Sequence, residues 1–277
     1  MKITLVQSRG IVMDPKANFF KARMRINNVD SEIFVFPEMF CSGYVSDPHK
    51  MQVDFLKKTI LSDLATVSKI KGCTVICGCP MKDEDGRIYD KALVIDGDLL
   101  GEYSKINLNK NGYFDETEVF EAGDSPMIVD RQGLRMGLAV GHDLYMDGLV
   151  RYYAENEADL IICMSALLPG EIDAFLKVAQ SEALKFNIPI LVCNMTGNDP
   201  GTAMGGKSAF IGANGEFLET CTTGSDVREI RIDLDAYKKQ TAERVIPKDP
   251  ALKNGTVYEV KNVEEDLEAA KACPFFG

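Results

Sequence analysis

One segment of the chain, LRMGLAVGHDLYMDG from Leu134 to Gly148, has the pattern of a strand, a tight turn and a helix. Its apolar run ends abruptly at Gly141-His142-Asp143. Such a junction lifts one side chain out of a sheet edge and aims backbone N–H groups at the space above it, which suits attack on a carbonyl carbon. The residue at the apex is glycine, which has no nucleophile. The segment therefore predicts a catalytic scaffold that lacks its attacking group.

Two further residues near apolar runs are candidates for chemistry. IFVFPE (33–38) has the pattern of a short buried strand that Pro37 ends, and its last residue is the carboxylate Glu38. His142 is one of only two histidines and adjoins Asp143. Because adjacent residues usually point apart, we expect His142 to line the turn rather than to transfer protons.

Strands and helices that alternate along the chain must position these residues. Helices are expected at 15–29, at 53–67, from about 147, and at 171–187. Strands are expected at 3–7, 33–38, 73–79, 91–97, 127–130, 134–141, 159–166, 188–194 and 227–234, with a hairpin at 208–221 that turns at Asn214-Gly215.

The order of these elements predicts the fold class. Each half of the chain has a strand, a helix, a strand, a helix and paired strands, and the strands are almost continuously apolar. Such strands form sheets whose outer faces are covered by helices. Two such halves packed sheet on sheet give an α/β fold of four layers, an αββα sandwich.

No linker divides the sequence, so we expect a single domain over 1–277. Residues 248–277 are rich in Lys and Glu and end in Pro-Phe-Phe. They are too irregular for the core and are expected to form a C-terminal arm that reaches across a subunit interface.

Composition and charge limit the partners. The chain has 45% hydrophobic residues and a formal net charge of −11, which argues against nucleic acid or an anionic membrane as the main partner. No apolar stretch reaches the roughly 18 residues of a membrane span, and the N-terminus has no signal-peptide pattern. We expect a cytoplasmic protein whose partner is a small molecule or another protein.

Eight cysteines stand at positions 41, 73, 77, 79, 163, 193, 221 and 273. Three of them lie in KGCTVICGCP, which reads as a strand. A zinc site would need a fourth ligand and usually a Cys-x2-Cys knuckle. We therefore expect buried, reduced thiols and no metal.

Several segments, taken together and in this order, resemble the nitrilase superfamily, the carbon–nitrogen hydrolases, over roughly residues 1–245. VFPEMF (35–40) is similar to the strand that ends in the family's catalytic Glu, and YSKINL (103–108), with FEAGD (120–124) after it, is similar to the segment with its catalytic Lys. The other matching segments are GLAVGHDLYMDG (137–148) as the nucleophile elbow, ENEADLIICMSA (155–166), NMTG (194–197) and GGKSAFIGANGEFL (205–218).

The resemblance implies a role for each matching residue. Glu38 would be the general base, and its burial would raise its pKa toward the working range. Lys105 would stabilise the oxyanion of a tetrahedral intermediate together with the backbone N–H of His142. Glu116 would be a second acidic residue that positions the substrate or the lysine, although Glu118 is close enough to be confused with it.

The resemblance also identifies the substrate contacts and what is missing. His142, Tyr145 and Asn194 would contact the substrate. The family has its nucleophilic cysteine where this chain has Gly141. Cys41, near Glu38 but outside the elbow, is a weak substitute. Further departures from the family's pattern put the substrate preference in doubt, at Asn107, Tyr145, Asp147 and Gly148.

The implied activity is hydrolysis of a small linear amide or carbamoyl compound, without a cofactor, by a homodimer or larger homo-oligomer. Three explanations of Gly141 stay open. It is an engineered replacement of a catalytic cysteine, it marks a natural pseudoenzyme that binds a ligand or a partner, or water activated by Glu38 or His142 attacks directly. In the first two cases the chain as written has little or no activity, because the covalent nucleophile is gone.

Overall fold

The computed structural model describes residues 1–110, 112–199 and 202–247, so the expected arm at 248–277 lies outside the described residues. Fourteen strands are described: β1 Lys2–Gln7, β2 Ile33–Val35, β3 Thr74–Lys82, β4 Ile88–Ile95, β5 Leu99–Ser104, β6 Ile128–Arg131, β7 Leu134–Val140, β8 Leu160–Ser165, β9 Ile190–Asn194, β10 Thr196–Asp199, β11 Thr202–Gly205, β12 Ala209–Ile211, β13 Phe217–Thr220 and β14 Asp226–Arg231.

The helices lie between these strands. They are α1 Pro15–Asn28, α2 Pro48–Met51, α3 Val53–Phe55, the π-helix η1 Leu56–Ile60, α4 Leu61–Lys71, the 3-10 helices η2 Glu116–Glu118 and η3 Gly141–Tyr145, α5 Asp147–Glu155, α6 Ile172–Phe186 and α7 Leu234–Ala242. In the part of the chain that the structure describes, no helix is both long and apolar enough to span a bilayer.

Two six-stranded sheets form the centre of the fold. The first has the order β14-β1-β2-β3-β4-β5 and the second the order β13-β12-β9-β8-β7-β6. Parallel pairs join β1 to β2 and β2 to β3 in the first sheet, and β7 to β8 and β8 to β9 in the second. In both sheets the parallel strands are central and buried, as continuous apolar runs require.

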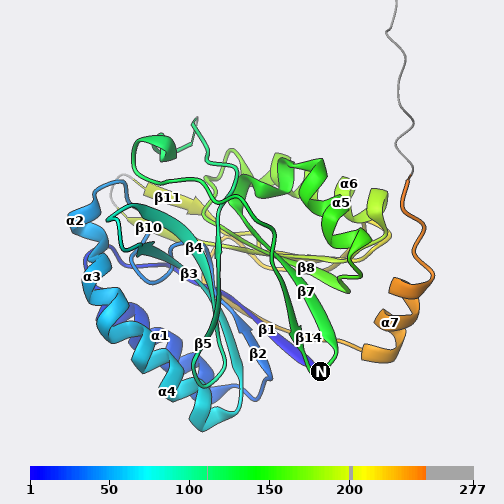
Figure 1. Ribbon diagram of the computed structural model, residues 1–277, viewed down its shortest axis with the longest axis horizontal. Helices are drawn as coiled ribbons and strands as arrows, with labels where there is room; N and C mark the ends of the chain where they lie inside the picture. The colour runs from blue at the N-terminus through cyan, green and yellow to red at the C-terminus, as the bar shows by residue number, and fades with distance from the viewer. Residues whose placement is uncertain (111, 200–201, 248–277) are drawn as a thin grey trace, which may run out of the picture. The chain divides into compact units, whose positions relative to one another are not determined.

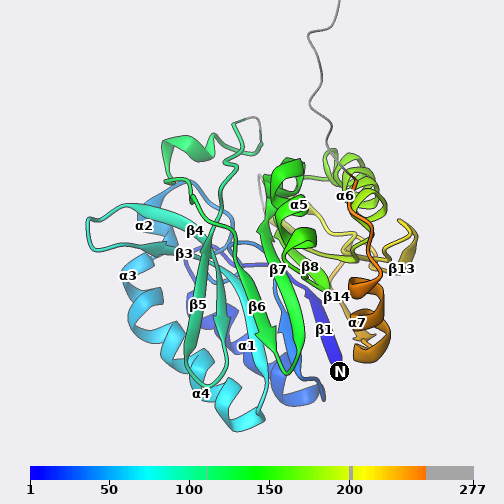
Figure 2. The same ribbon diagram turned by 45° about the vertical axis from the view of Figure 1, so that its right-hand side comes forward.

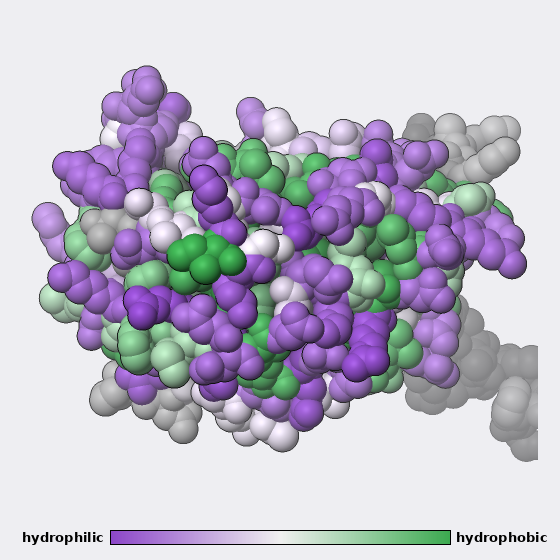
Figure 3. Space-filling model, turned by 90° about the horizontal axis from the view of Figure 1, so that it is seen from below, coloured by the Kyte–Doolittle hydropathy of each residue, from purple (hydrophilic) through white to green (hydrophobic). Residues whose placement is uncertain are grey.

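Helices cover the outer face of each sheet, which gives the expected four-layer αββα sandwich. α1 and α4 lie below the first sheet and α5 and α6 above the second in Figure 1, and Figure 2 shows the same layers after a turn of 45°. Apolar side chains of both sheets meet in the central layer, among them Leu5, Val35, Leu138 and Ile162. The face of the molecule seen from below is mainly hydrophilic, with small separate apolar areas (Figure 3).

Several elements differ from the expectation. β14 comes after the second half of the chain but pairs with β1, so it belongs to the first sheet. The predicted helix at 53–67 is interrupted by η1 and ends at Lys71. The sequence analysis missed the β10–β11 hairpin and α7, since neither has a long periodic apolar pattern.

Candidate active site

Glu38 lies just beyond β2, where backbone contacts hold it in place. Pro37 accepts hydrogen bonds from the N–H groups of Gly78 at 3.0 Å and Phe40 at 3.3 Å, and Met39 has a left-handed φ of 47°. Gly78 in β3 is needed here, because a Cβ on it would lie 2.3–2.5 Å from backbone atoms of residues 37–39. The tight turn leaves the Glu38 side chain 1% exposed.

Lys105 joins two buried carboxylates in an ion cluster that consists of Glu38, Lys105 and Glu116. Its Nζ donates to Glu38 Oε1 at 2.6 Å and to Glu116 Oε1 at 2.7 Å. The residue follows β5 and is anchored by its own backbone, whose N–H donates to the Asp90 carbonyl at 2.9 Å. All three charged side chains are at most 2% exposed. The geometry brings together the three groups that the sequence analysis named for acid–base and oxyanion chemistry.

The structure distinguishes Glu116 from Glu118. Glu116 opens the short helix η2 and is fully buried, whereas Glu118 is exposed. The second carboxylate oxygen of Glu116 accepts the backbone N–H of Asn109 at 2.7 Å, and Tyr44 donates its hydroxyl to Oε1 at 2.6 Å. Glu116 is therefore the acidic partner of Lys105.

Burial and charge act in opposite directions on the cluster. Burial raises the pKa of Glu38, and the nearby Lys105 ammonium only partly offsets this effect. Burial alone would lower the pKa of Lys105, but the surrounding carboxylates of Glu38, Glu116 and Asp90 outweigh it and raise that pKa. The charged form of Lys105 is thus favoured, and burial increases the proton affinity of Glu38.

Gly141 lies at the turn after β7 with a left-handed φ of 48°. An ideal Cβ at this position would lie 3.0 Å from Lys105 Nζ and 3.1 and 3.2 Å from the two carboxylate oxygens of Glu38. A side chain here would therefore point straight at the ion cluster. Glycine adopts the left-handed conformation without the strain that other residues incur.

Asp143 holds the turn in place. Its Oδ1 accepts the backbone N–H groups of Ile106 and Asn107 at 3.0 and 2.7 Å. Its Oδ2 accepts the N–H of Val140 at 2.9 Å and the hydroxyl of Tyr103 at 2.8 Å. Asp143 thereby joins the segment after Lys105 to the elbow, although burial raises its pKa.

Two predicted substrate contacts, His142 and Tyr145, lie at the elbow together with Asn107, a departure from the family's pattern. Asn107 donates its side-chain amide to the His142 carbonyl at 2.8 Å, so it supports the turn. His142 stacks on Tyr145 with ring centroids 5.2 Å apart. Burial, together with the Lys105 charge, lowers the pKa of His142 to about 4, so the imidazole is neutral near pH 7. Substrate contact by His142 and Tyr145 remains a prediction.

Two other predicted positions are engaged within the protein. Asn194 is fully buried, and its amide bonds to Ser165, Leu167 and Gly206, so its hydrogen-bonding groups support two loops. Asp147 is exposed and pairs with Lys185 of α6 at 2.7 Å. The expectation of an Asn194–substrate contact is therefore not supported by its geometry.

Two cysteines near the site, Cys41 and Cys163, are buried. Cys41 is buried with its Sγ 3.9 Å from that of Cys77. The hydrogen bond with Cys77 acts to lower its pKa, but contact with Cys79 and burial raise that pKa well above the ordinary value. Burial likewise raises the pKa of Cys163, whose Sγ lies 3.7 Å from the Gly141 carbonyl oxygen in the core behind the elbow. These surroundings disfavour the thiolate form that a nucleophile needs.

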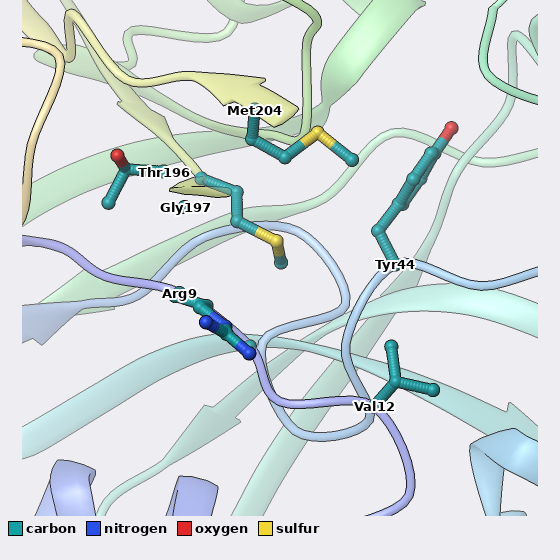
Figure 4. Close-up of a pocket in the computed structure, with 8 residues that line it drawn as sticks. Arg9, Val12, Tyr44, Thr196, Gly197 and Met204 are labelled. Atoms are coloured by element: carbon teal, nitrogen blue, oxygen red, sulfur yellow. The ribbon is translucent and has the colours of Figure 1, made fainter. Parts of the chain in front are cut away.

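A small cavity adjoins the site beside Tyr44 (Figure 4). Its volume is about 30 Å³, room for one or two water molecules. Arg9 and Val12 from the loop after β1, Thr196 and Met204 from the β10–β11 hairpin, and Tyr44 line it. Tyr44 connects this cavity to the ion cluster, because its hydroxyl donates to Glu116.

Sequence reasoning missed three residues of the site. Tyr44 comes from a loop with no pattern, and Tyr103 from a strand in which nothing distinguished it. Asp90 had a signal, because it alternates with Ala92 and Val94 of β4, which are both fully buried. A carboxylate on a core-facing strand position is a candidate site residue.

Comparison with known proteins gives one family. Residues 2–241 match the family model described as carbon–nitrogen hydrolase. A glutamine-dependent NAD(+) synthetase of Thermotoga maritima is 27% identical over 276 residues, which cover 95% of this chain and 47% of the synthetase. A 2-oxoglutaramate amidase of Paenarthrobacter nicotinovorans is 24% identical over 76% of this chain and 74% of the amidase. The chain spans about half the length of the NAD(+) synthetases that it matches.

Solved structures share the fold. The glutamine-dependent NAD+ synthetase of Acinetobacter baumannii aligns with a TM-score of 0.78 and 23% identity over 91% of this chain and 48% of the synthetase chain. An amidase of the nitrilase superfamily from Nesterenkonia, solved with alanine in place of a cysteine, aligns with a TM-score of 0.73 and 22% identity over 88% of this chain and 95% of the amidase. Both alignments show that this chain shares its fold with these two proteins.

Proposed function

The chain belongs to the carbon–nitrogen hydrolase family, and from this premise we propose that it carries an amidase-type site for small linear amide or carbamoyl compounds in which Gly141 removes the covalent step. The observation that carries the proposal is the direction of the Gly141 Cβ position, 3.0 Å from Lys105 Nζ and 3.1–3.2 Å from the Glu38 carboxylate. A thiol placed there would meet both a base and a cation.

The retained groups have the roles that the resemblance to the family implies, and their geometry is compatible with these roles. With a thiol at position 141, Glu38 takes the thiol proton while sulfur attacks the carbonyl carbon, and Lys105 stabilises the negative oxygen. Glu38 then returns the proton to the leaving nitrogen as the C–N bond breaks. Water, deprotonated by Glu38, finally hydrolyses the thioester. Glu116, which accepts hydrogen bonds from Lys105 and from Tyr44, would hold the Lys105 ammonium in place beside the negative oxygen.

The names of the relatives suggest which amides to test first. The synthetases are named as glutamine-dependent, and another relative is named as an amidase of 2-oxoglutaramate. Glutamine and 2-oxoglutaramate are both terminal amides of a small carboxylic acid. A panel of these two compounds, simple aliphatic amides and carbamoyl compounds therefore tests the proposed substrate class.

The test is ammonia release by the Gly141→Cys variant. We expect the variant to exceed the unchanged chain by about a thousandfold or more, because a covalent nucleophile contributes several powers of ten. Gly141→Ala, which adds bulk without a thiol, is the matched control and should stay inactive. Adding Glu38→Gln to the Gly141→Cys variant should abolish the gain. A folded Gly141→Cys variant that hydrolyses no compound of the panel would overturn the proposal.

A ligand-binding pseudoenzyme is the second candidate, and the tightness of the cluster favours it. A Cβ only 3.0–3.2 Å from charged atoms is closer than ordinary contact, so Lys105 and Glu38 occupy part of the volume that a nucleophile would need. Under this alternative the unchanged chain binds an amide or related ligand without turnover. Calorimetric titration with the same panel measures this binding, which Tyr44→Phe and Glu38→Gln should weaken.

A further inference from the structure

Asp90 is a buried acidic residue next to the ion cluster, and no group of the described residues donates a hydrogen bond to its carboxylate. It lies in β4 opposite Pro80 of β3 and is 0% exposed. Among the residues that the structure describes, no N–H or hydroxyl group donates to either of its carboxylate oxygens. An ionised carboxylate in such a place loses its hydration without compensation.

Other carboxyl groups lie close to Asp90. Its carboxylate oxygen, one of Glu38 and one of Glu116 all lie within 4.8 Å of one another. A hydrogen bond between the Asp90 and Glu38 side chains would lower the pKa of Glu38 and raise that of Asp90. The other titratable groups that face Asp90 are Lys105, Tyr44 and Cys79.

The charges of this region do not balance if every group is ionised. Glu38, Asp90 and Glu116 would contribute three negative charges, and Lys105 contributes one positive charge. Two neighbouring carboxylates in a dry site cannot both remain ionised, so one of them binds a proton. Glu38 and Glu116 each have the Lys105 ammonium within 2.7 Å, whereas Asp90 has no cation bonded to it. The proton therefore belongs on Asp90.

We propose that Asp90 is a neutral carboxylic acid whose O–H donates a hydrogen bond to the Glu38 carboxylate, so that the two residues share one proton. Asp90 then positions Glu38 together with Lys105. Burial, and next to it the negative charge of Glu38, raises the pKa of Asp90 well above its ordinary value, in agreement with this assignment. The inference rests on the proposed function only for the use of Glu38 as a base.

A bound divalent cation is the other way to satisfy three clustered carboxyl groups. Lys105 Nζ argues against it, because this ammonium lies 2.6 and 2.7 Å from Glu38 and Glu116 and already takes the place of a cation. A proton satisfies Asp90 without displacing the lysine.

The first experiment compares urea unfolding of the unchanged chain and the Asp90→Asn variant across pH. The asparagine amide can donate to Glu38 as the carboxylic acid does, but it does not titrate. An unfolded aspartate ionises near pH 3.9 while the folded one keeps its proton, so folding of the unchanged chain is disfavoured as pH rises. We therefore compare the equilibrium constant of unfolding of the unchanged chain with that of Asp90→Asn. The ratio of the first to the second should increase about tenfold per pH unit above about pH 4. Asp54→Asn, at an exposed position, is the control. A constant or falling ratio would overturn the proposal.

The second experiment observes the proton directly and needs no folded variant. The side-chain carboxyl ¹³C resonance of Asp90 in the unchanged chain should keep its carboxylic-acid position from about pH 5 to about pH 7. A resonance at the carboxylate position in this pH range would show that Asp90 is ionised. A shift of the resonance on addition of Mg²⁺ or Ca²⁺ would show a cation site. Either result would overturn the proposal. Both experiments are independent of ammonia release, so failure of the Gly141→Cys test leaves their outcome unaffected.

Discussion

Replacement of Lys105 by methionine should destabilise the protein strongly, because it leaves buried carboxylates without their cation. Lys105 is 1% exposed and makes charge-assisted hydrogen bonds of 2.6 and 2.7 Å. Two such bonds at about 1.5–3 kcal/mol each give a loss of about 3–6 kcal/mol, in agreement with about 3–5 kcal/mol for breaking a buried ion pair. Urea unfolding near pH 7 measures this loss.

The stability of the Lys105→Met variant should also change with pH, in a direction that can be predicted. Without the ammonium, the pKa of Glu38 in the folded state rises further above its unfolded value of about 4.3. Stability of Lys105→Met is therefore greatest at low pH and falls as pH rises from about 4.3 toward the folded pKa. The defect should be smaller at about pH 5 than at about pH 8.

Lys207→Met is the matched control, since Lys207 pairs with Asp173 at the same 2.7 Å but both side chains are exposed. A surface pair contributes about 0–1 kcal/mol. Equal losses in Lys105→Met and Lys207→Met, or a defect that grows at low pH, would refute the assignment of Lys105 as the buried cation of the site.

Two further predictions concern the support of the site. Asp143→Ala leaves three N–H groups and one hydroxyl without an acceptor and should cost about 3 kcal/mol or more, whereas Tyr103→Phe should cost about 1 kcal/mol; equal unfolding midpoints would contradict this. Gly78→Ala should lower the free energy of unfolding by about 1–3 kcal/mol, since the added Cβ would lie 2.3–2.5 Å from backbone atoms. Gly148→Ala, in α5 at a position where a Cβ has open space around it, should be neutral or stabilising. Thermal melting measures both effects.

The elements of the fold could be predicted where the signal is local. Pro15 opens a helix after Asp14, whose side chain accepts the N–H of Ala17 at 3.0 Å, and the Asn214-Gly215 turn lies between β12 and β13 as expected. The pairing of β14 with β1 could not be predicted, because it joins segments more than 200 residues apart and depends on the assembled sheet.

The candidate site also contains residues that the sequence could predict and residues that it could not. Glu38 and Gly141 follow apolar strands, so the positions themselves indicated a role. Lys105 and Glu116 were identified by resemblance, and the choice between Glu116 and Glu118 needed the observed burial. Tyr44 reaches Glu116 across 72 residues of chain, and no sequence pattern encodes that contact.

The hydrogen bonds of Asp143 have a consequence for how the chain can change over generations. They fix the Lys105 segment and the elbow through backbone atoms and Tyr103, and none of them involves a side chain at position 141. A substitution at that position therefore leaves this support in place. Codons for glycine and cysteine can differ by a single base, so one point mutation separates the two forms of the site. Because position 141 has a left-handed φ of 48° and a Cβ there would lie 3.0–3.2 Å from Lys105 and Glu38, the turn and these two side chains would still have to adjust to a cysteine.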